Sequence, residues 1–273
     1  MIVVRTIDDL RTKLVNEISV GLVPTMGAFH EGHLSLMRQA REACQVVVTS
    51  IFVNPTQFGP KEDFEKYPRD EAADLSLAEA AGVDIAFCPS ATEIYPRKTT
   101  VVSVEGVTDL WEGSLRPGHF NGVSTVVLKL FNIVQPNVSY FGLKDYQQCT
   151  VIKRMVEDLD IPIDLRFCET VRAPDGLAMS SRNRYLSDAS RQIAPRLFQE
   201  LTSTSRKLRL ADPDVVDVLE RSKRELESFG FSVDYFALVD SNTLERLSVL
   251  NDACRLIAAA KLEGTRLLDN VAV

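Results

Sequence analysis

The sequence has no apolar run that approaches the roughly 20 residues a helix needs to cross a bilayer. It also has no excess of basic residues, since its formal net charge is -7 and its pI is about 5.2. Nucleic-acid binding depends largely on clustered cations, whereas a small anionic ligand needs only a local basic pocket. We therefore expect a cytoplasmic protein that binds neither nucleic acid nor membrane.

Cysteine and histidine are also scarce. The five cysteines are odd in number, widely spaced and mostly next to apolar residues: Cys44, Cys88, Cys149, Cys168 and Cys254. This pattern favours buried thiols over disulfides, zinc ligands or a nucleophile. Two of the three histidines, His30 and His33, stand three residues apart, which is not the spacing of a zinc protease. Only His119 remains as a third ligand, so a zinc site is the less favoured interpretation.

The order of apolar patterns predicts an α/β fold. Through about residue 172, short β-branched runs alternate with helical patterns, which is typical of a parallel sheet with crossover helices. The predicted strands cover 21–25, 46–53, 83–88, 138–142 and 163–168, and the predicted helices cover 33–44, 70–81, 123–134 and 146–158. We expect a Rossmann-like, parallel-sheet nucleotide-binding domain over residues 1–172.

A different pattern begins near residue 187. Two helical segments, 187–209 and 213–229, precede three runs with the character of antiparallel strands, at 231–240, 254–261 and 265–273. The polar segment between Glu169 and Ser187 is the expected junction. The sequence therefore predicts a smaller C-terminal α+β domain over residues 173–273.

The stretch VPTMGAFHEGH, residues 23–33, joins a predicted strand to a predicted helix that starts near His33. Its histidines would lie at the carboxyl edge of the sheet, where open α/β sheets bind ligands. The helix N-terminus favours a phosphate, and the two imidazoles add donors that an anion can keep protonated. We interpret His30 and His33 as a phosphate clamp. Two helix-capping histidines without a ligand remain the alternative.

Two further segments place polar side chains at predicted strand ends and helix starts. Asn54 and Gln57 lie in VNPTQFG, where uncharged amides suit the recognition of a hydroxyl or carboxylate, although an ordinary turn explains the segment too. His119 lies between two glycines beside Arg116, before a predicted helix. All three histidines thus lie at glycine-flanked helix starts.

Lys144 and Asp145 follow the predicted strand 138–142, with Gln148 one helical turn further on. A lysine at this edge is a point charge for phosphate, while a solvent-facing Lys-Asp pair that opens a helix is the alternative. The segment AMSSRNR, residues 178–184, offers two hydroxyls and Arg182 on what we predict to be a mobile loop. A merely solvated loop is the alternative there.

Taken together, PTMGAFHEGH, VNPTQF, YPRD, RPGHFNGV, GLKDYQQ and GLAMSSRNRYLS resemble, in this order, the pantothenate synthetase family of pantoate–β-alanine ligases. That family belongs with the nucleotidylyltransferases and class I aminoacyl-tRNA synthetases, and HEGH and MSSR are similar to its two signature motifs. The resemblance implies condensation of (R)-pantoate with β-alanine through a pantoyl adenylate, with ATP and Mg²⁺. It also implies a lid-like C-terminal domain and a homodimer.

The resemblance also assigns residues. Its ATP site falls on Met26, Gly27, Ala28, Phe29, His30, Glu31, Gly32, His33, Gly142, Leu143, Lys144, Asp145, Val171, Met179, Ser180, Ser181 and Arg182. Its catalytic residues fall on His33, His30 and Lys144, and its pantoate and β-alanine pocket falls on Gln57, Gln148, Asn54 and His119, with Met26 a lesser candidate. The family often has glutamate where this chain has Leu143, so only a backbone contact to the nucleotide is expected there.

The sequence leaves three questions open: the metal ligands and two alternative functions. The metal ligands are unassigned, and Asp70 and Asp74 are carboxylates without a place. A nucleotidylyltransferase that transfers AMP to a phosphate and stops shares the first motif. A nucleotide sensor without turnover would use the same pocket.

Overall fold

The computed structural model describes residues 1–60, 62–210 and 214–273. They form two compact units. The larger unit is Met1–Leu143 with Gln147–Glu169, and the smaller is Lys144–Tyr146 with Thr170–Val273. Two residues of the predicted nucleotide site, Lys144 and Asp145, therefore pack with the C-terminal part of the chain. The expected roles of the two parts stay a prediction.

A parallel sheet forms the centre of the larger unit. Its six strands have the order β1-β4-β3-β2-β5-β6, and every pair is parallel. They are β1 (Ile2–Val4), β2 (Val20–Thr25), β3 (Val46–Ile51), β4 (Ile85–Phe87), β5 (Val138–Gly142) and β6 (Asp164–Cys168). This confirms the predicted parallel sheet. The edge strand β1 was not predicted, since three residues carry too little periodicity.

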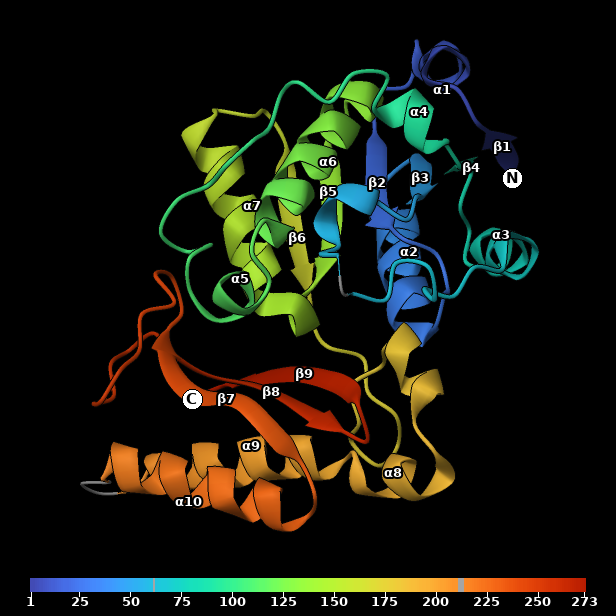
Figure 1. The fold of residues 1–273 in the computed structure, drawn as a ribbon. Coiled ribbons are helices and arrows are strands. Elements are labelled where there is room, and N and C mark those ends of the chain that lie inside the picture. The colour runs from blue at the N-terminus through green and yellow to red at the C-terminus, as the bar shows by residue number, and fades with distance from the viewer. Residues whose placement is uncertain (61, 211–213) are drawn as a thin grey trace. The chain divides into compact units, whose positions relative to one another are not determined.

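Helices and short 3₁₀ turns connect these strands (Figure 1). They are α1 (Ile7–Leu14), α2 (Glu31–Ala43), η1 (Pro55–Gln57), α3 (Glu71–Ala80), α4 (Ala91–Ile94), α5 (Trp111–Leu115), α6 (His119–Val134), η2 (Leu143–Asp145) and α7 (Tyr146–Asp158). Apolar residues of α2 and α3, among them Met37 and Ala78, share one buried cluster with Val47 of β3. Helix α6 begins at His119, four residues before its apolar stripe at Val123, because Gly118 with φ 82° starts the first turn.

The chain leaves the centre of this sheet in two directions. From β2 it runs outward through β3 and β4, and from β5 it runs outward through β6. Neighbouring strands β2 and β5 therefore flank the point where the strand order reverses, and their carboxyl ends are Thr25 and Gly142. Open α/β sheets bind ligands at such a point. The topology thus places the end of β2, which leads into the histidine pair, at the expected position of a ligand site.

The smaller unit packs helices on an antiparallel sheet of order β7-β8-β9. Its elements are η3 (Ser181–Tyr185), α8 (Asp188–Ile193), α9 (Arg196–Leu208), α10 (Val215–Ser228), β7 (Ser232–Asp240), β8 (Cys254–Leu262) and β9 (Thr265–Ala272). Its core includes Leu201, Leu226, Leu238 and Leu256. The α+β character predicted for this region is confirmed.

The single helix predicted over 187–209 was wrong. The chain forms α8 and α9 instead, because Pro195 lacks an N–H and cannot continue the first helix. Helix α10 begins after its N-cap Asp214, and residue 213, where the second helix was predicted to start, lies outside the described residues.

All five cysteines are buried and none forms a disulfide, as expected from their spacing. Burial raises the pKa of the Cys88 thiol to about 11, so this thiol is not activated as a nucleophile.

Within the described residues, no helix is long and apolar enough to cross a membrane.

Candidate active site

A tight turn follows β2 and leads into α2. Gly27 (φ 78°) and Ala28 (φ 54°) both adopt left-handed backbone conformations. The Asp74 carboxylate stabilises this turn, because Oδ2 accepts a hydrogen bond from the Ala28 N–H at 2.7 Å and Oδ1 accepts one from Phe29 at 2.7 Å. Asp74 lies in α3 and is only 3% exposed.

The sequence alone gives Asp74 no role, although it carries one signal for the role that the structure shows. Helical spacing puts Asp74 on the same face of α3 as Ala78, which is fully buried. A carboxylate on a buried helix face needs hydrogen-bond donors, and here the backbone of the turn supplies them. Asp70, the other unplaced carboxylate, accepts from the Ala73 N–H as the N-cap of α3.

The two histidines of the first motif form a capping box at the start of α2, which begins at Glu31 rather than near His33. His30 Nδ1 accepts a hydrogen bond from the Gly32 N–H at 3.1 Å, and His33 Nδ1 accepts one from the His30 N–H at 3.4 Å. The ring centroids lie 4.1 Å apart. Of the two alternatives that the sequence leaves open, helix capping and phosphate binding, the capping is present.

These hydrogen bonds assign a tautomer to both rings. Because each Nδ1 accepts from a backbone N–H, the proton of the neutral imidazole is on Nε2. A second proton, on Nδ1, would break the cap. In this arrangement each Nε2 is the ring nitrogen that donates, and the expectation that an anion keeps these rings protonated stays a prediction. Both side chains are half-buried.

Asn54, Gln57, Met26 and His119 lie close together in the larger unit. The Gln57 amide donates from Nε2 to Met26 Sδ at 3.1 Å, and its Oε1 accepts from Asn54 Nδ2 at 3.1 Å. Asn54 is 1% exposed, and its Oδ1 also accepts from the Tyr95 hydroxyl at 2.9 Å. The fold thus brings residues of the first two motifs close to the third histidine, and their role as a substrate pocket stays a prediction.

Both ring nitrogens of His119 are bonded within the protein. Nδ1 donates to the Gln57 carbonyl oxygen at 2.8 Å, and Nε2 lies 3.1 Å from Arg116 Nη1. Burial lowers the pKa of His119 to about 4, and the Arg116 charge contributes to this lowering. The ring is therefore neutral at physiological pH, and its contacts hold the backbone that carries the Gln57 side chain.

Arg116 in turn is paired with Glu62 through two short contacts, Nε–Oε1 at 2.8 Å and Nη2–Oε2 at 2.6 Å. Burial raises the pKa of Glu62, but the hydrogen bonds and charge of Arg116 outweigh this, and the net pKa is lowered. Helix α6 approaches η1 at Gly122, where an added Cβ would collide with the Thr56 carbonyl oxygen. Only glycine permits this contact.

The two adjacent glutamines at the start of α7 differ in their surroundings. Gln147 is 8% exposed, accepts from the Glu112 N–H and donates to the carbonyl oxygens of Val107 and Leu110. Gln148 is half-buried, and its amide makes no hydrogen bond to the described residues. The structure therefore distinguishes a structural glutamine from one whose amide is available to a ligand.

The remaining predicted nucleotide-site residues lie in the smaller unit, apart from Gly142 and Leu143 at the end of β5. Lys144 Nζ lies 3.3 Å from the half-exposed Asp145 carboxylate. Val171 accepts from the Met179 N–H at 2.9 Å, which closes a hairpin through residues 172–178. Ser180 then caps η3, which contains Ser181 and Arg182. The predicted loop is thus a hydrogen-bonded hairpin followed by a 3₁₀ turn, and its mobility stays a prediction.

No group of three or more His, Cys, Asp or Glu side chains that could hold a metal ion occurs among residues 1–60, 62–210 and 214–273. Asp74 and Asp70 both bond backbone amides. The residues that the structure describes therefore offer no preformed metal centre.

The fold and this geometry define a class. An open parallel sheet whose β2 ends, at the reversal of strand order, in a glycine turn and a helix capped by two histidines is a Rossmann-like fold with the arrangement of a nucleotide-binding site. Comparison with known proteins gives the particular family. The family model described as Pantoate-beta-alanine ligase matches residues 2–272, and the chain belongs to this family.

Individual members of this family are similar to the chain over its full length. Pantothenate synthetase from Acidiphilium cryptum is 50% identical over 279 residues, with 100% of both chains covered. The crystal structure of pantothenate synthetase from Thermus thermophilus has a TM-score of 0.95 at 46% identity, covering 100% of this chain and 99% of that one. Pantoate-beta-alanine ligase from Francisella tularensis, complexed with beta-gamma ATP and beta-alanine, has a TM-score of 0.84 at 35% identity, covering 100% and 97%.

Proposed function

We propose that this protein joins (R)-pantoate to β-alanine at the expense of ATP, through a pantoyl adenylate. The observation that carries the proposal is the histidine capping box at the sheet's switch point, beside an amide pair suited to a hydroxy acid. A relative of similar fold was solved with beta-gamma ATP and beta-alanine, which supports a pocket for both in this family.

The proposed chemistry has two steps. A carboxylate oxygen of pantoate attacks the α-phosphorus of ATP, the bond to the β-phosphate oxygen breaks, and pyrophosphate leaves. The amine of β-alanine then attacks the acyl carbon, the bond to the AMP oxygen breaks, and the amine nitrogen loses a proton. Neither step needs a covalent bond to the protein, which agrees with the burial of all five thiols.

The protein's part is to position groups and neutralise charge. His30 and His33 donate from Nε2, and together with the N-terminus of α2 they stabilise charge on the α- and β-phosphates. Lys144 binds the triphosphate as a point charge. Phosphoryl transfer gains most of its rate from such contacts, because charge develops on the leaving pyrophosphate.

We propose that fewer residues contact pantoate than the resemblance implies. Gln57 and Gln148 carry the amides that orient pantoate, since Gln148 has no internal partner in the described chain and Gln57 lies at the Met26 turn. Asn54 and His119 act on pantoate indirectly, because their polar atoms hydrogen-bond to Gln57. These two residues are proposed as positioning residues rather than substrate ligands.

Mg²⁺ is proposed to arrive with ATP as part of the substrate. This ion commonly keeps several waters and binds through substrate phosphates, so a preformed protein cage is not required. We also propose a homodimer in the cytoplasm, on the basis of the family alone. Sedimentation equilibrium tests the dimer directly.

Pyrophosphate exchange into ATP, measured with pantoate and without β-alanine, tests the two-step scheme. We expect exchange, because the first step should be reversible when pyrophosphate is supplied. A nucleotide sensor would show none. A nucleotidylyltransferase that stops after AMP transfer would leave a stable adenylylated product and make no amide when β-alanine is added.

Lys144→Ala tests the phosphate assignment within this scheme. Losing one such electrostatic contact typically lowers turnover by roughly 10²- to 10³-fold, and we expect that loss in adenylate formation. Supplied with preformed pantoyl adenylate and β-alanine, the variant should keep most of its rate, because pyrophosphate has already left. Equal losses in both half-reactions by a folded variant would contradict the assignment.

A further inference from the structure

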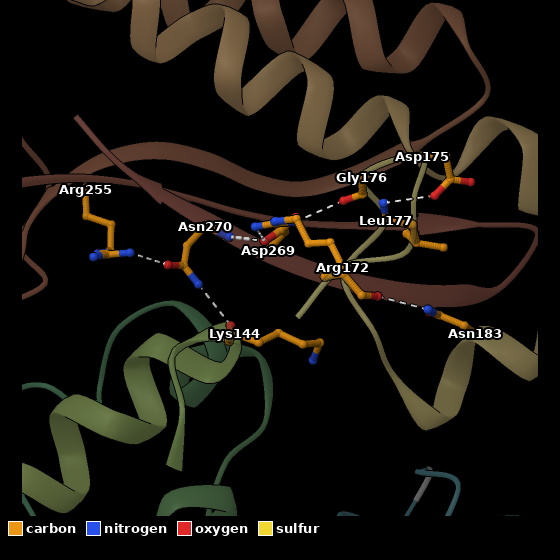
Figure 2. Close-up of polar contacts among 10 residues, drawn as sticks. Lys144, Arg172, Asp175, Gly176, Leu177, Asn183, Arg255, Asp269 and Asn270 are labelled. Carbon is orange, nitrogen blue, oxygen red and sulfur yellow. Dashed lines mark hydrogen bonds and ion pairs between the residues drawn. The ribbon is translucent and has the colours of Figure 1, made fainter. Parts of the chain in front are cut away.

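The backbone of Lys144 is held by a buried asparagine of the C-terminal sheet. Asn270, in β9, is 5% exposed, and its Nδ2 donates to the Lys144 carbonyl oxygen at 3.0 Å (Figure 2). Its Oδ1 accepts from Arg255 Nη1 at 2.5 Å, so the amide is oriented by a charged donor on its other side. Asn270 and Lys144 are 126 positions apart in the sequence and belong to the same compact unit.

The segment Lys144–Tyr146 is bound to the rest of the smaller unit at a second point. The Tyr146 hydroxyl donates to the Ser241 carbonyl oxygen at 2.8 Å, and the Arg255 guanidinium lies 4.1 Å from the centroid of the Tyr146 ring. Lys144 and Tyr146 are thus both fixed to the small sheet. The Lys144 side chain extends from this anchored backbone (Figure 2), and its Nζ lies 3.3 Å from the half-exposed Asp145 carboxylate.

The neighbouring residue, Asp269, binds Arg172 in the hairpin that precedes the Met179–Arg182 segment. It is 3% exposed and forms a two-point ion pair with Arg172, at 2.6 and 2.9 Å. Arg172 also donates to the Gly176 carbonyl oxygen and stacks 3.6 Å above the Phe198 ring. It pairs with Ala178 across the base of the hairpin that leads directly to Met179–Arg182.

Strand geometry explains how one dipeptide reaches both segments. Successive residues of a strand face opposite sides of the sheet. Asp269 pairs across the sheet with Ala258, which belongs to the core beneath the helices, and Asn270 pairs with Ile257, which does not. The Asn270 N–H donates to Asp269 Oδ1 at 2.8 Å, which links the two anchors.

We propose that the Asp269-Asn270 step of β9 is a positioning element that fixes the Lys144 segment relative to the Met179–Arg182 segment, with Asn270 the positioning residue for Lys144. A lysine side chain has about 2 kcal/mol of rotamer entropy and no rigid geometry, so the place of its ammonium depends on where its backbone is held. The inference rests on the proposed role of Lys144 in binding ATP.

Two Asn270 variants test it. Asn270→Asp keeps the size and the acceptor for Arg255 but turns the donor to Lys144 into a second acceptor, and Asn270→Ala removes the donor without adding charge. We expect both to raise the Kd for ATP about tenfold, the cost of a buried carbonyl that loses its donor. Pantoate KM and the rate from preformed pantoyl adenylate should stay unchanged. Hydrogen exchange of the amides at 144–148 should accelerate.

Thr204→Val is the matched control. Thr204 Oγ1 lies 2.6 Å from Ser222 Oγ, a buried hydrogen bond in the same unit between side chains that belong to α9 and α10 rather than to either motif. The control should lower the melting temperature without changing the Kd for ATP. If it weakens ATP binding as much as Asn270→Ala does, general loss of stability explains the effect and the proposal is overturned.

A double variant separates this inference from the proposed function. In a Lys144→Ala background, Asn270→Ala should weaken ATP binding no further, because the side chain it positions is gone. If Lys144→Ala alone leaves the Kd for ATP unchanged, the proposed role of Lys144 fails. If Lys144→Ala weakens binding but folded Asn270 variants do not, or if the two effects are additive, only the positioning role fails.

Discussion

Replacing Asp74 with alanine removes the acceptor for two backbone N–H groups of the turn after β2. The two hydrogen bonds, both 2.7 Å, go to a carboxylate that is 3% exposed. A hydrogen bond to a charged group contributes about 1.5–3 kcal/mol, and the variant also relieves the cost of burying that charge. We therefore expect the free energy of unfolding, measured by urea denaturation, to fall by about 3 kcal/mol.

The same variant should impair adenylate formation. Ala28 and Phe29 lead directly to His30, and a displacement of about 1 Å in a positioned group costs roughly 10²-fold in rate. Pyrophosphate exchange measures this loss. Asp74→Asn, which keeps one acceptor, should lie between alanine and wild type in both measurements.

Asp70→Ala is the control from the same helix. Asp70 is exposed and caps α3 through one 3.1 Å hydrogen bond to Ala73, so its loss should cost about 1 kcal/mol and leave exchange unaffected. If Asp74→Ala unfolds at the same urea concentration as Asp70→Ala and exchanges pyrophosphate normally, the turn does not depend on Asp74.

Three further predictions follow from the acid pocket. Because His119 has a pKa of about 4 when folded against an ordinary value of 6.5, the unfolded chain binds more protons between these values, and stability falls as pH drops from 6.5 to 4. His119→Gln should remove on the order of 3 kcal/mol of that pH dependence in urea titrations, and an unchanged slope would exclude His119 as its source. Gly122→Ala should cost about 2 kcal/mol and raise the pantoate KM, because its Cβ meets a backbone carbonyl oxygen. Gln148→Ala should raise the pantoate KM without changing stability, whereas Gln147→Ala should lower the melting temperature. The reverse pattern would exchange their roles.

Local patterns in the sequence were sufficient for the fold class and for the turn that carries the histidine pair. The parallel sheet followed from β-branched runs that alternate with helical periods, and the histidine pair followed from a strand, a glycine turn and a helix start within residues 23–33. These features depend on neighbours along the chain, so periodicity and turn chemistry reveal them. The break at Pro195 is equally local, although the prediction of one helix over 187–209 did not include it.

Tertiary structure alone decided which polar groups form hydrogen bonds with each other. Asp74 lies 46 positions from the Ala28 N–H that it binds, and Asn270 lies 126 positions from the Lys144 carbonyl oxygen. Likewise, only packing separates the buried Gln147 from the available Gln148, although both stand in the same sequence context. A side chain's partner across such distances is set by strand order and by the need of every buried donor and acceptor for a partner, and no local pattern encodes either.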